Sequence, residues 1–131
     1  MHRWKVATTV EFDAWFASLS QTVKGEDAQA EVIAKVELLK VFGPALPRPH
    51  ADTLKGSKHA NMKELRATTA DAVLRIAFAF DPNRSAILLC AGNKGGVNER
   101  RFYKQLVGRA DRLYREHLEA IHAATRKSKR D

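Results

Sequence analysis

The sequence has little of what secreted, membrane-spanning or fibrous proteins need. Its 131 residues include a single cysteine, Cys90, so no disulfide can form within the chain and a cysteine-based zinc site is not expected. No apolar run approaches the length of a membrane span, and the opening residues MHRWKVATTV lack the apolar core of a signal peptide. Four prolines and seven glycines exclude a collagen-like or low-complexity chain. We therefore expect one small cytoplasmic domain over residues 1–123, followed by a frayed basic tail over residues 124–131, with no membrane association.

The charge of the chain is strongly positive and unevenly distributed. Lys and Arg number 23 against 15 Asp and Glu, which gives a net charge of +8 and a pI near 9.9. Residues 48–109 carry 12 basic and 5 acidic side chains, whereas residues 1–47 carry 5 and 6. We place the sheet and its loops in this basic middle region. Such a surface attracts a polyanion, most commonly nucleic acid, although a generally solvated basic surface would give the same counts.

The pattern of apolar residues predicts seven elements of secondary structure. We expect a strand at residues 2–7, a first helix opened by a capping box of Thr8 and Glu11, a second helix at 26–42, strands at 62–67, 73–80 and 86–91, and a final helix at 98–123. Prolines and glycines indicate irregular structure at residues 45–61. This order predicts an α+β fold, in which an N-terminal helical hairpin and a C-terminal helix pack on one side of an antiparallel sheet of about four strands.

Charged side chains from two neighbouring strands should meet on one face of this sheet. Because side chains alternate along a strand, an inward Leu65 sends Glu64 and Arg66 to the opposite face. The apolar residues around Arg75 turn it the same way, among small alanines that leave room for a bulky ligand. Arginine forks suit phosphate oxygens, and two arginines beside one carboxylate leave positive charge. The pattern therefore favours an open anion-binding surface over a solvated cross-strand salt bridge.

Other possible sites carry weaker signals. The glycine-rich segment GNKGG at residues 92–96 lacks the frame of a nucleotide-binding P-loop, although its backbone could approach a phosphate. His50 and His59, and likewise His117 and His122, do not have the spacing of metal ligands on a helix. Cys90 falls in an apolar strand and is interpreted as a packing residue. We expect neither a metal nor a cofactor.

The two predicted helices are followed by the segments DTLKGSKHANMKELRA, VLRIAFAF, AILLCAGNKGG and RFYKQLVGRADRLY. In this order and spacing, over residues 3–120, the chain resembles the RelE/ParE superfamily of bacterial toxins, and most closely its HigB-like, phage-associated branch. The resemblance implies the toxin of a type II toxin–antitoxin system, an mRNA interferase that cleaves mRNA on the ribosome and inhibits translation. It also implies a cognate antitoxin, often a helix-turn-helix protein, as partner.

The resemblance carries residue roles with it. Arg66 of the KELR motif and Arg75 of the LRI motif would bind phosphate and stabilise the transition state, and Tyr103 would be an acid or a stacking residue. Further basic positions of the family fall on Lys55 and Lys63, which lead into KELR, and on Lys94, which follows the last strand. The sequence departs from the best-known members, because Met62 and Glu64 stand where those members carry two lysines.

The chemistry itself needs no metal, since the 2′-hydroxyl of RNA can attack the adjacent phosphorus. The protein must position that attack and stabilise negative charge on the phosphate. Glu64 or His59 could take the proton, and Tyr103 or His59 could supply one to the leaving oxygen. The candidate catalytic residues are thus Arg66, Arg75, Glu64, Tyr103 and Lys94, and the candidate RNA-binding residues are Lys55, Lys58, His59 and Lys63.

Two other functions remain open at this point. The basic loop around Lys55 and Lys58, together with the tail, should dock ribosomal RNA mainly through phosphate contacts if the chain is a nuclease. A ParE-like protein would instead block DNA gyrase without any catalysis, and a plain nucleic-acid-binding module would do neither. Codon-phased cuts in mRNA on translating ribosomes would distinguish the nuclease from both.

Overall fold

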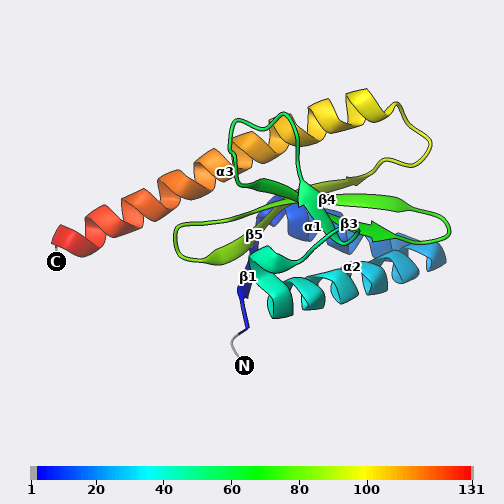
Figure 1. Ribbon diagram of the computed structural model, residues 1–131, viewed down its shortest axis with the longest axis horizontal. Coiled ribbons are helices and arrows are strands. Elements are labelled where there is room, and N and C mark those ends of the chain that lie inside the picture. The colour runs from blue at the N-terminus through cyan, green and yellow to red at the C-terminus, as the bar shows by residue number, and fades with distance from the viewer. Residues whose placement is uncertain (1–2, 131) are drawn as a thin grey trace.

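The structure, a computed structural model, describes residues 3–130 and is drawn in Figure 1. The elements are β1 (Lys5–Thr8), α1 (Val10–Ser18), α2 (Val23–Phe42), β2 (Ala51–Thr53), β3 (Met62–Thr68), β4 (Val73–Phe80), β5 (Ser85–Asn93) and α3 (Glu99–Arg130), with short 3-10 turns at Leu19–Gln21 and Gly43–Ala45. The α+β class is therefore confirmed. His2, which belongs to the predicted first strand, lies outside the described residues.

Local side chains fix where the first two helices begin and end. Thr9, rather than Thr8, caps α1, because Thr8 is the last residue of β1 and the Thr9 Oγ1 accepts a hydrogen bond from the Phe12 N–H at 3.0 Å. Thr22 caps α2 in the same way, earlier than predicted. The second helix ends at Gly43, where φ is +55° and an added Cβ would lie 2.3 Å from the Trp4 Nε1.

The five strands form one mixed sheet in the order β1-β5-β4-β3-β2. All neighbours are antiparallel except β1, which runs parallel to β5. The fifth strand, β2, lies in the segment that was expected to be irregular, where Ala51 pairs with Leu65 of β3. A strand of three residues between prolines and a glycine is too short to show an alternating pattern, which is why the sequence predicts only four strands.

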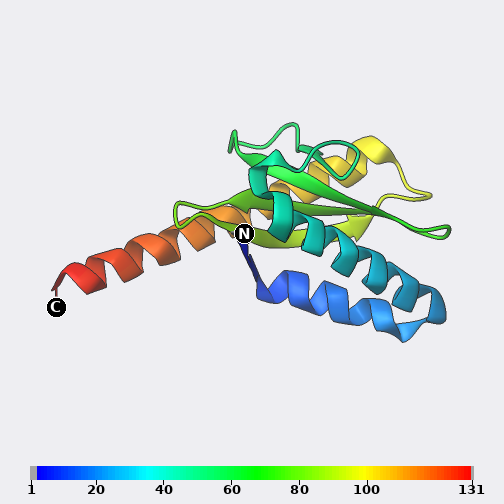
Figure 2. The ribbon, with the colours of Figure 1, turned by 60° about the horizontal axis from the view of Figure 1, so that its bottom comes forward.

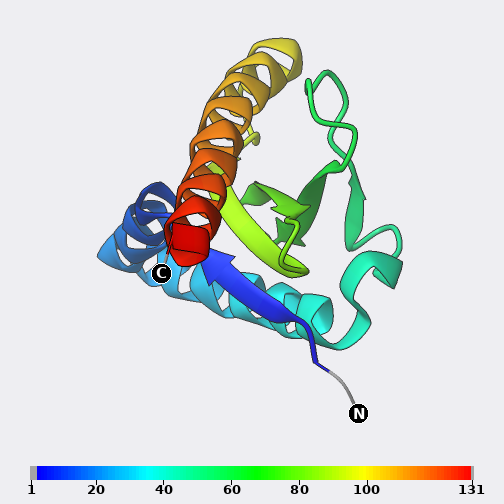
Figure 3. The same cartoon turned by 90° about the vertical axis from the view of Figure 1, so that its left-hand side faces the viewer.

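Helices cover both faces of the sheet, contrary to the prediction that they share one side (Figures 2 and 3). The helices α1 and α2 pack on the face that carries Leu65, Ile76 and Leu88. The helix α3 packs on the other face, against residues such as Ala77 and Leu89. Both faces of β4 and β5 are apolar, so each must be covered to keep it from water.

The last helix is longer than predicted and carries most of the excess charge. It continues past Ala123 to Arg130, because Arg and Lys favour a helix and no glycine or proline interrupts them; the tail is thus helical, not frayed, up to that residue. In Figures 1 and 2 its C-terminal part projects beyond the sheet. The helix has ten Lys or Arg and four Asp or Glu, a net +6 of the chain's +8. The larger share of the excess therefore lies on α3, whereas residues 48–98, with eight basic and four acidic side chains, keep a net +4 on the sheet and its loops.

No helix in the described part of the chain combines the length and the apolar character needed to cross a membrane.

Candidate active site

A polar groove of about 360 Å³ lies where β2, β3, the end of β5 and the first turns of α3 meet. Its lining residues are Arg48, Asp52, Thr53, Leu54, Lys55, Glu64, Arg66, Lys94, Glu99 and Tyr103. Five of the nine residues predicted as catalytic or RNA-binding are therefore together in one groove, namely Lys55, Glu64, Arg66, Lys94 and Tyr103. The other four are treated below.

The carboxylate of Glu64 is the centre of this site. Glu64 is only 4% exposed, and its Oε2 accepts hydrogen bonds from the Arg66 Nη2 at 2.9 Å and Nε at 3.2 Å. Its Oε1 accepts a hydrogen bond from the Tyr103 hydroxyl at 2.7 Å and lies 3.6 Å from the Arg75 Nε. One buried carboxylate thus holds two guanidinium groups and a phenol, and it fixes their relative positions.

The predicted convergence of Arg66 and Arg75 is confirmed, but the predicted open surface is wrong for Arg75. The two residues are direct partners in the β3–β4 register and both contact Glu64. Arg75 is only 8% exposed, its Nε donates to the Tyr103 hydroxyl at 3.2 Å, and its Nη1 donates to the Leu74 carbonyl at 3.0 Å. Alternation correctly predicts the face on which a side chain lies, but it does not reveal that α3 covers part of that face.

Arg66 keeps access to the groove and is balanced by more negative charge than predicted. Its side chain is 26% exposed, and its Nη2 also lies 3.4 Å from the Asp52 Oδ2, which the Arg48 Nε approaches to 3.2 Å. A hydrogen bond from the Thr53 N–H, followed by the charges of Arg48 and Arg66, lowers the pKa of Asp52. The hydrogen bond to Glu64 raises the pKa of Arg66, so both groups stay ionised.

Tyr103 and Lys94 form the opposite side of the groove. Burial, and then the hydrogen bond to Glu64, raise the pKa of the Tyr103 phenol, so it is protonated at neutral pH and acts as a donor. The Lys94 Nζ lies 5.5 Å from the centre of the Tyr103 ring and donates a hydrogen bond of 2.7 Å to the Glu99 Oε1. That bond lowers the pKa of Glu99, which leaves an exposed, ionised carboxylate at the rim.

The loop between β2 and β3 places its predicted RNA-binding residues in different surroundings. Lys55 lines the groove, but the next residues fold against α3, where the Ser57 Oγ and the Lys58 N–H donate to the two oxygens of Asp111 at 2.5 and 3.0 Å. The ring of His59 packs edge-on against Tyr114, with 4.9 Å between the ring centres. Neither Lys58 nor His59 lines the groove, because Asp111 draws this part of the loop along the helix.

Lys63 lies on the other side of the sheet from the groove. It alternates with Glu64 along β3 and shares the face of Leu65, which packs beneath α1 and α2. The prediction that Lys63 acts beside Arg66 on RNA therefore does not fit this register.

Three charged groove residues were not predicted as site residues: Arg48, Asp52 and Glu99. Asp52 is the direct β-sheet partner of Glu64, so the pairing of β2 with β3 brings the two carboxylates together. The signal that would have identified Asp52 is this short strand, which the sequence pattern does not reveal. No cluster of three His, Cys, Asp or Glu suited to a metal is found among residues 3–130.

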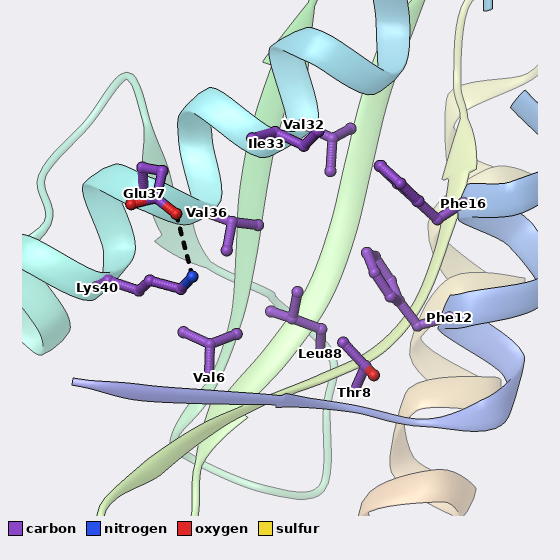
Figure 4. A pocket seen from close by; sticks show the side chains of 10 residues that line it. All are labelled: Val6, Thr8, Phe12, Phe16, Val32, Ile33, Val36, Glu37, Lys40 and Leu88. Atoms are coloured by element: carbon purple, nitrogen blue, oxygen red, sulfur yellow. Dashed lines mark hydrogen bonds and ion pairs between the residues drawn. The ribbon is translucent and has the colours of Figure 1, made fainter. Parts of the chain in front are cut away.

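A second cavity, of about 270 Å³, is apolar and lies on the far face of the sheet (Figure 4). It opens between α1 and α2 above β1 and β5, and its lining residues are Val6, Thr8, Phe12, Phe16, Val32, Ile33, Val36, Glu37, Lys40 and Leu88. The carboxylate among them, Glu37, forms ion pairs with Lys40 at 3.0 Å and with Arg3 at 2.6 Å. This cavity has no free acid, base or cation with which to carry chemistry.

Cys90 is a packing residue, as predicted. It is 2% exposed in the core beneath α3, and burial raises the pKa of its thiol to about 11. The thiol is therefore neutral and is not a nucleophile at physiological pH.

Comparison with known proteins now identifies the class of this protein. Residues 14–115 match the family model described as phage derived protein Gp49-like (DUF891), and the chain belongs to this family. Together with the two relatives described next, this match confirms the resemblance to the HigB-like, phage-associated branch of the RelE/ParE superfamily.

Two relatives from Mycobacterium tuberculosis (strain ATCC 25618 / H37Rv) carry names that designate them as candidate toxins. The first, HigB2, is 40% identical over 120 residues, which cover 87% of this chain and 59% of that protein. The second, HigB3, is 40% identical over 112 residues, which cover 86% of this chain and 91% of that protein. The chain thus spans little more than half the length of HigB2. No solved structure gives a significant match.

Proposed function

We propose that this protein is the toxin of a type II toxin–antitoxin system and that it inhibits translation in the cytoplasm by cleaving mRNA on the ribosome. The family and the relatives named as toxins support the first part of this proposal. The observation that carries the second part is the groove itself, in which Arg66, Lys94 and a protonated Tyr103 surround a space large enough for a phosphodiester.

The reaction in this proposal uses the RNA's own nucleophile. The 2′-oxygen forms a bond to phosphorus, the bond between phosphorus and the 5′-oxygen breaks, and the products are a 2′,3′-cyclic phosphate and a 5′-hydroxyl. Negative charge grows on the phosphate oxygens during this step. Arg66 and Lys94 are the two groove cations placed to stabilise that charge, and a fixed guanidinium or ammonium donor is worth several kcal/mol in such a role.

Glu64 and Tyr103 are suited to move the two protons. Glu64 takes the proton of the 2′-hydroxyl, and Tyr103 gives its phenolic proton to the departing 5′-oxygen. The 2.7 Å hydrogen bond between the Glu64 Oε1 and the Tyr103 hydroxyl then returns the proton from one to the other and restores both groups. Glu64 is a better candidate than His59 for the base, because His59 packs against Tyr114 outside the groove lining.

Arg75 has a different role in this proposal from the one predicted from the sequence. Its guanidinium is occupied by Tyr103, Glu64 and the Leu74 carbonyl and is nearly buried. It therefore acts as a positioning residue, which holds the phenol and the carboxylate in place and does not itself grip the phosphate. Restoration of activity by lysine at this position would argue against that role, because lysine cannot hold both partners at once.

This proposal implies two partners, the ribosome with its mRNA and a cognate antitoxin. The resemblance to this branch of the family implies that the antitoxin is a helix-turn-helix protein. The groove is the surface that such an antitoxin must block or distort to silence the nuclease.

The test is to add the purified protein to translating ribosomes and map the 5′ ends of the mRNA. Cuts in phase with codons that disappear in Arg66→Ala and persist in the distant control Lys24→Ala support the proposal, since Lys24 is exposed and pairs with Asp71 outside the groove. Intact message together with trapped gyrase–DNA breaks would overturn it in favour of a gyrase inhibitor.

A further inference from the structure

The positive charge of α3 is concentrated on the side that faces water. The buried side of the helix carries Leu106, Ala110, Leu113 and Tyr114. With 3.6 residues per turn, the basic residues on the opposite side are Arg101, Lys104, Arg112, Arg115, His122, Arg126 and Lys129. Arg112 is held in ion pairs by Glu11 and Glu116, and we call the other six the α3 ridge. All six are exposed, and the ridge is about 42 Å long at 1.5 Å per residue.

Within residues 3–130, no acidic side chain forms an ion pair with a ridge residue. Two acids share this side of the helix, Asp111 and Glu119, so the five Lys and Arg of the ridge outnumber them. The cations of the groove, in contrast, are matched by Asp52, Glu64 and Glu99. The ridge is thus the larger uncompensated positive surface of the molecule.

The composition of the ridge distinguishes between the two kinds of acidic partner that could cover it. A protein partner needs apolar anchors in the centre of its interface. The large apolar side chains exposed on the described chain are Val10, Val23, Ile33, Val41, Phe42 and Val97, and none of them belongs to α3. A nucleic-acid backbone needs only cations that follow its phosphates, which a straight helix with basic residues over about 42 Å provides.

We propose that the α3 ridge docks this protein on the phosphate backbone of a double-stranded segment of ribosomal RNA, separately from the mRNA in the groove. The choice of ribosomal RNA rests on the proposed function, whereas the backbone contact does not. Tyr103 lies on the groove side of the first turns of α3, and Arg101 and Lys104 lie on the outer side of the same turns. Docking through the ridge therefore fixes how the groove is oriented toward the message.

The test compares two triple variants that lose the same charge. The ridge variant is Arg115→Gln, Arg126→Gln and Lys129→Gln, and the control variant is Lys5→Gln, Lys24→Gln and Lys40→Gln on β1 and α2. Binding to a double-stranded ribosomal RNA fragment and to purified ribosomes is measured at several salt concentrations. For the ridge variant we expect affinity near 0.1 M salt to fall on the order of 10- to 100-fold, and the slope of log K against log salt to shrink by about 3.

The control variant is expected to bind within about twofold of the unchanged protein, because its lysines lie away from the ridge. Equal losses in both variants would show that net charge alone matters and would overturn the inference. So would an RNA affinity of the ridge variant equal to that of the unchanged protein, since the ridge would then make no contact with the phosphate backbone. Unaltered far-ultraviolet circular dichroism and Tm verify that both variants fold.

The same experiment separates this inference from the proposed function. If the unchanged protein cleaves no mRNA on ribosomes while the ridge variant still loses RNA binding, the nuclease proposal fails and the docking surface stands. If the unchanged protein cleaves mRNA and the ridge variant binds and cleaves equally well, the nuclease proposal stands and the docking surface fails.

Discussion

Replacement of Glu64 by glutamine tests whether one buried carboxylate organises the candidate site. Glutamine keeps the shape of the side chain but removes the negative charge that faces two guanidinium groups. Arg66 would still have Asp52 within 3.4 Å and is partly in water, whereas Arg75, 8% exposed, would lose its one ion-pair partner among the described residues. Removing one partner of a buried ion pair costs about 3–5 kcal/mol of the free energy of unfolding. Because Arg66 keeps Asp52 and contact with water, we expect a smaller loss, about 2–3 kcal/mol, for Glu64→Gln.

Urea unfolding followed by tryptophan fluorescence measures this loss, with the free energy extrapolated to water. The matched control is Asp52→Asn, which removes the other groove carboxylate from Arg66 but leaves Arg75 paired, and its urea midpoint should stay close to that of the unchanged protein. A loss below about 1 kcal/mol for Glu64→Gln would refute the reasoning. Arg75 would then be stabilised by Tyr103 and the Leu74 carbonyl alone, and Glu64 would not be the centre of the site.

Further predictions concern Tyr103, Cys90 and the two glycines Gly43 and Gly108. Tyr103→Phe should lower the cleavage rate about 10²- to 10⁴-fold, as expected for loss of a general acid, in single-turnover assays on ribosomes. The pKa of Tyr103 is raised in the folded protein, so its contribution to the free energy of unfolding is present below pH 10 and is lost as pH rises through the folded pKa. The free energy of unfolding of Tyr103→Phe should therefore fall less steeply above pH 10 than that of the unchanged protein. Cys90, buried and with a thiol pKa of about 11, should react with a disulfide reagent only after unfolding, and rapid reaction of the folded protein would contradict its burial. Gly43→Ala should lower the free energy of unfolding by about 2 kcal/mol or more, because φ is positive there and the added Cβ would meet the Trp4 ring. Gly108→Ala, where nothing lies within 4 Å of the added Cβ, should raise it by about 1 kcal/mol. Thermal unfolding measures both changes.

The parts of the site that were predictable from the sequence are those set by alternation within one strand. Glu64 and Arg66 share a face because they are two residues apart on β3, and the Leu-Arg-Ile pattern of β4 puts Arg75 on that face as well. Both statements need only the period of a strand and a hairpin, and the structure agrees with both. The fold class follows from the same local signals, because helix caps and strand patterns are properties of short segments.

What could not be predicted depends on contacts between distant segments. Asp52 belongs to the site only because β2 pairs with β3, and Arg75 is buried only because Tyr103 and α3 lie over it. The direction of the loop at Lys58 is set by Asp111, which follows it by 53 residues. The charge counts by residue number also placed residues 100–109, which carry four basic side chains, in the basic middle region. In the structure these residues belong to the same helix as the tail.

The arrangement of α3 links the two proposed activities of the protein through one rigid element. The helix carries Tyr103 on its groove side and the ridge cations on its outer side, so the position of the proton donor relative to a docked RNA is set by helix geometry rather than by a flexible linker. The same helix holds the β2–β3 loop through Asp111, and that loop continues from Lys55 at the groove. Changes that bend α3 between Lys104 and Arg115 should therefore lower cleavage on ribosomes more than they lower RNA binding, because both surfaces would survive while their alignment would be lost.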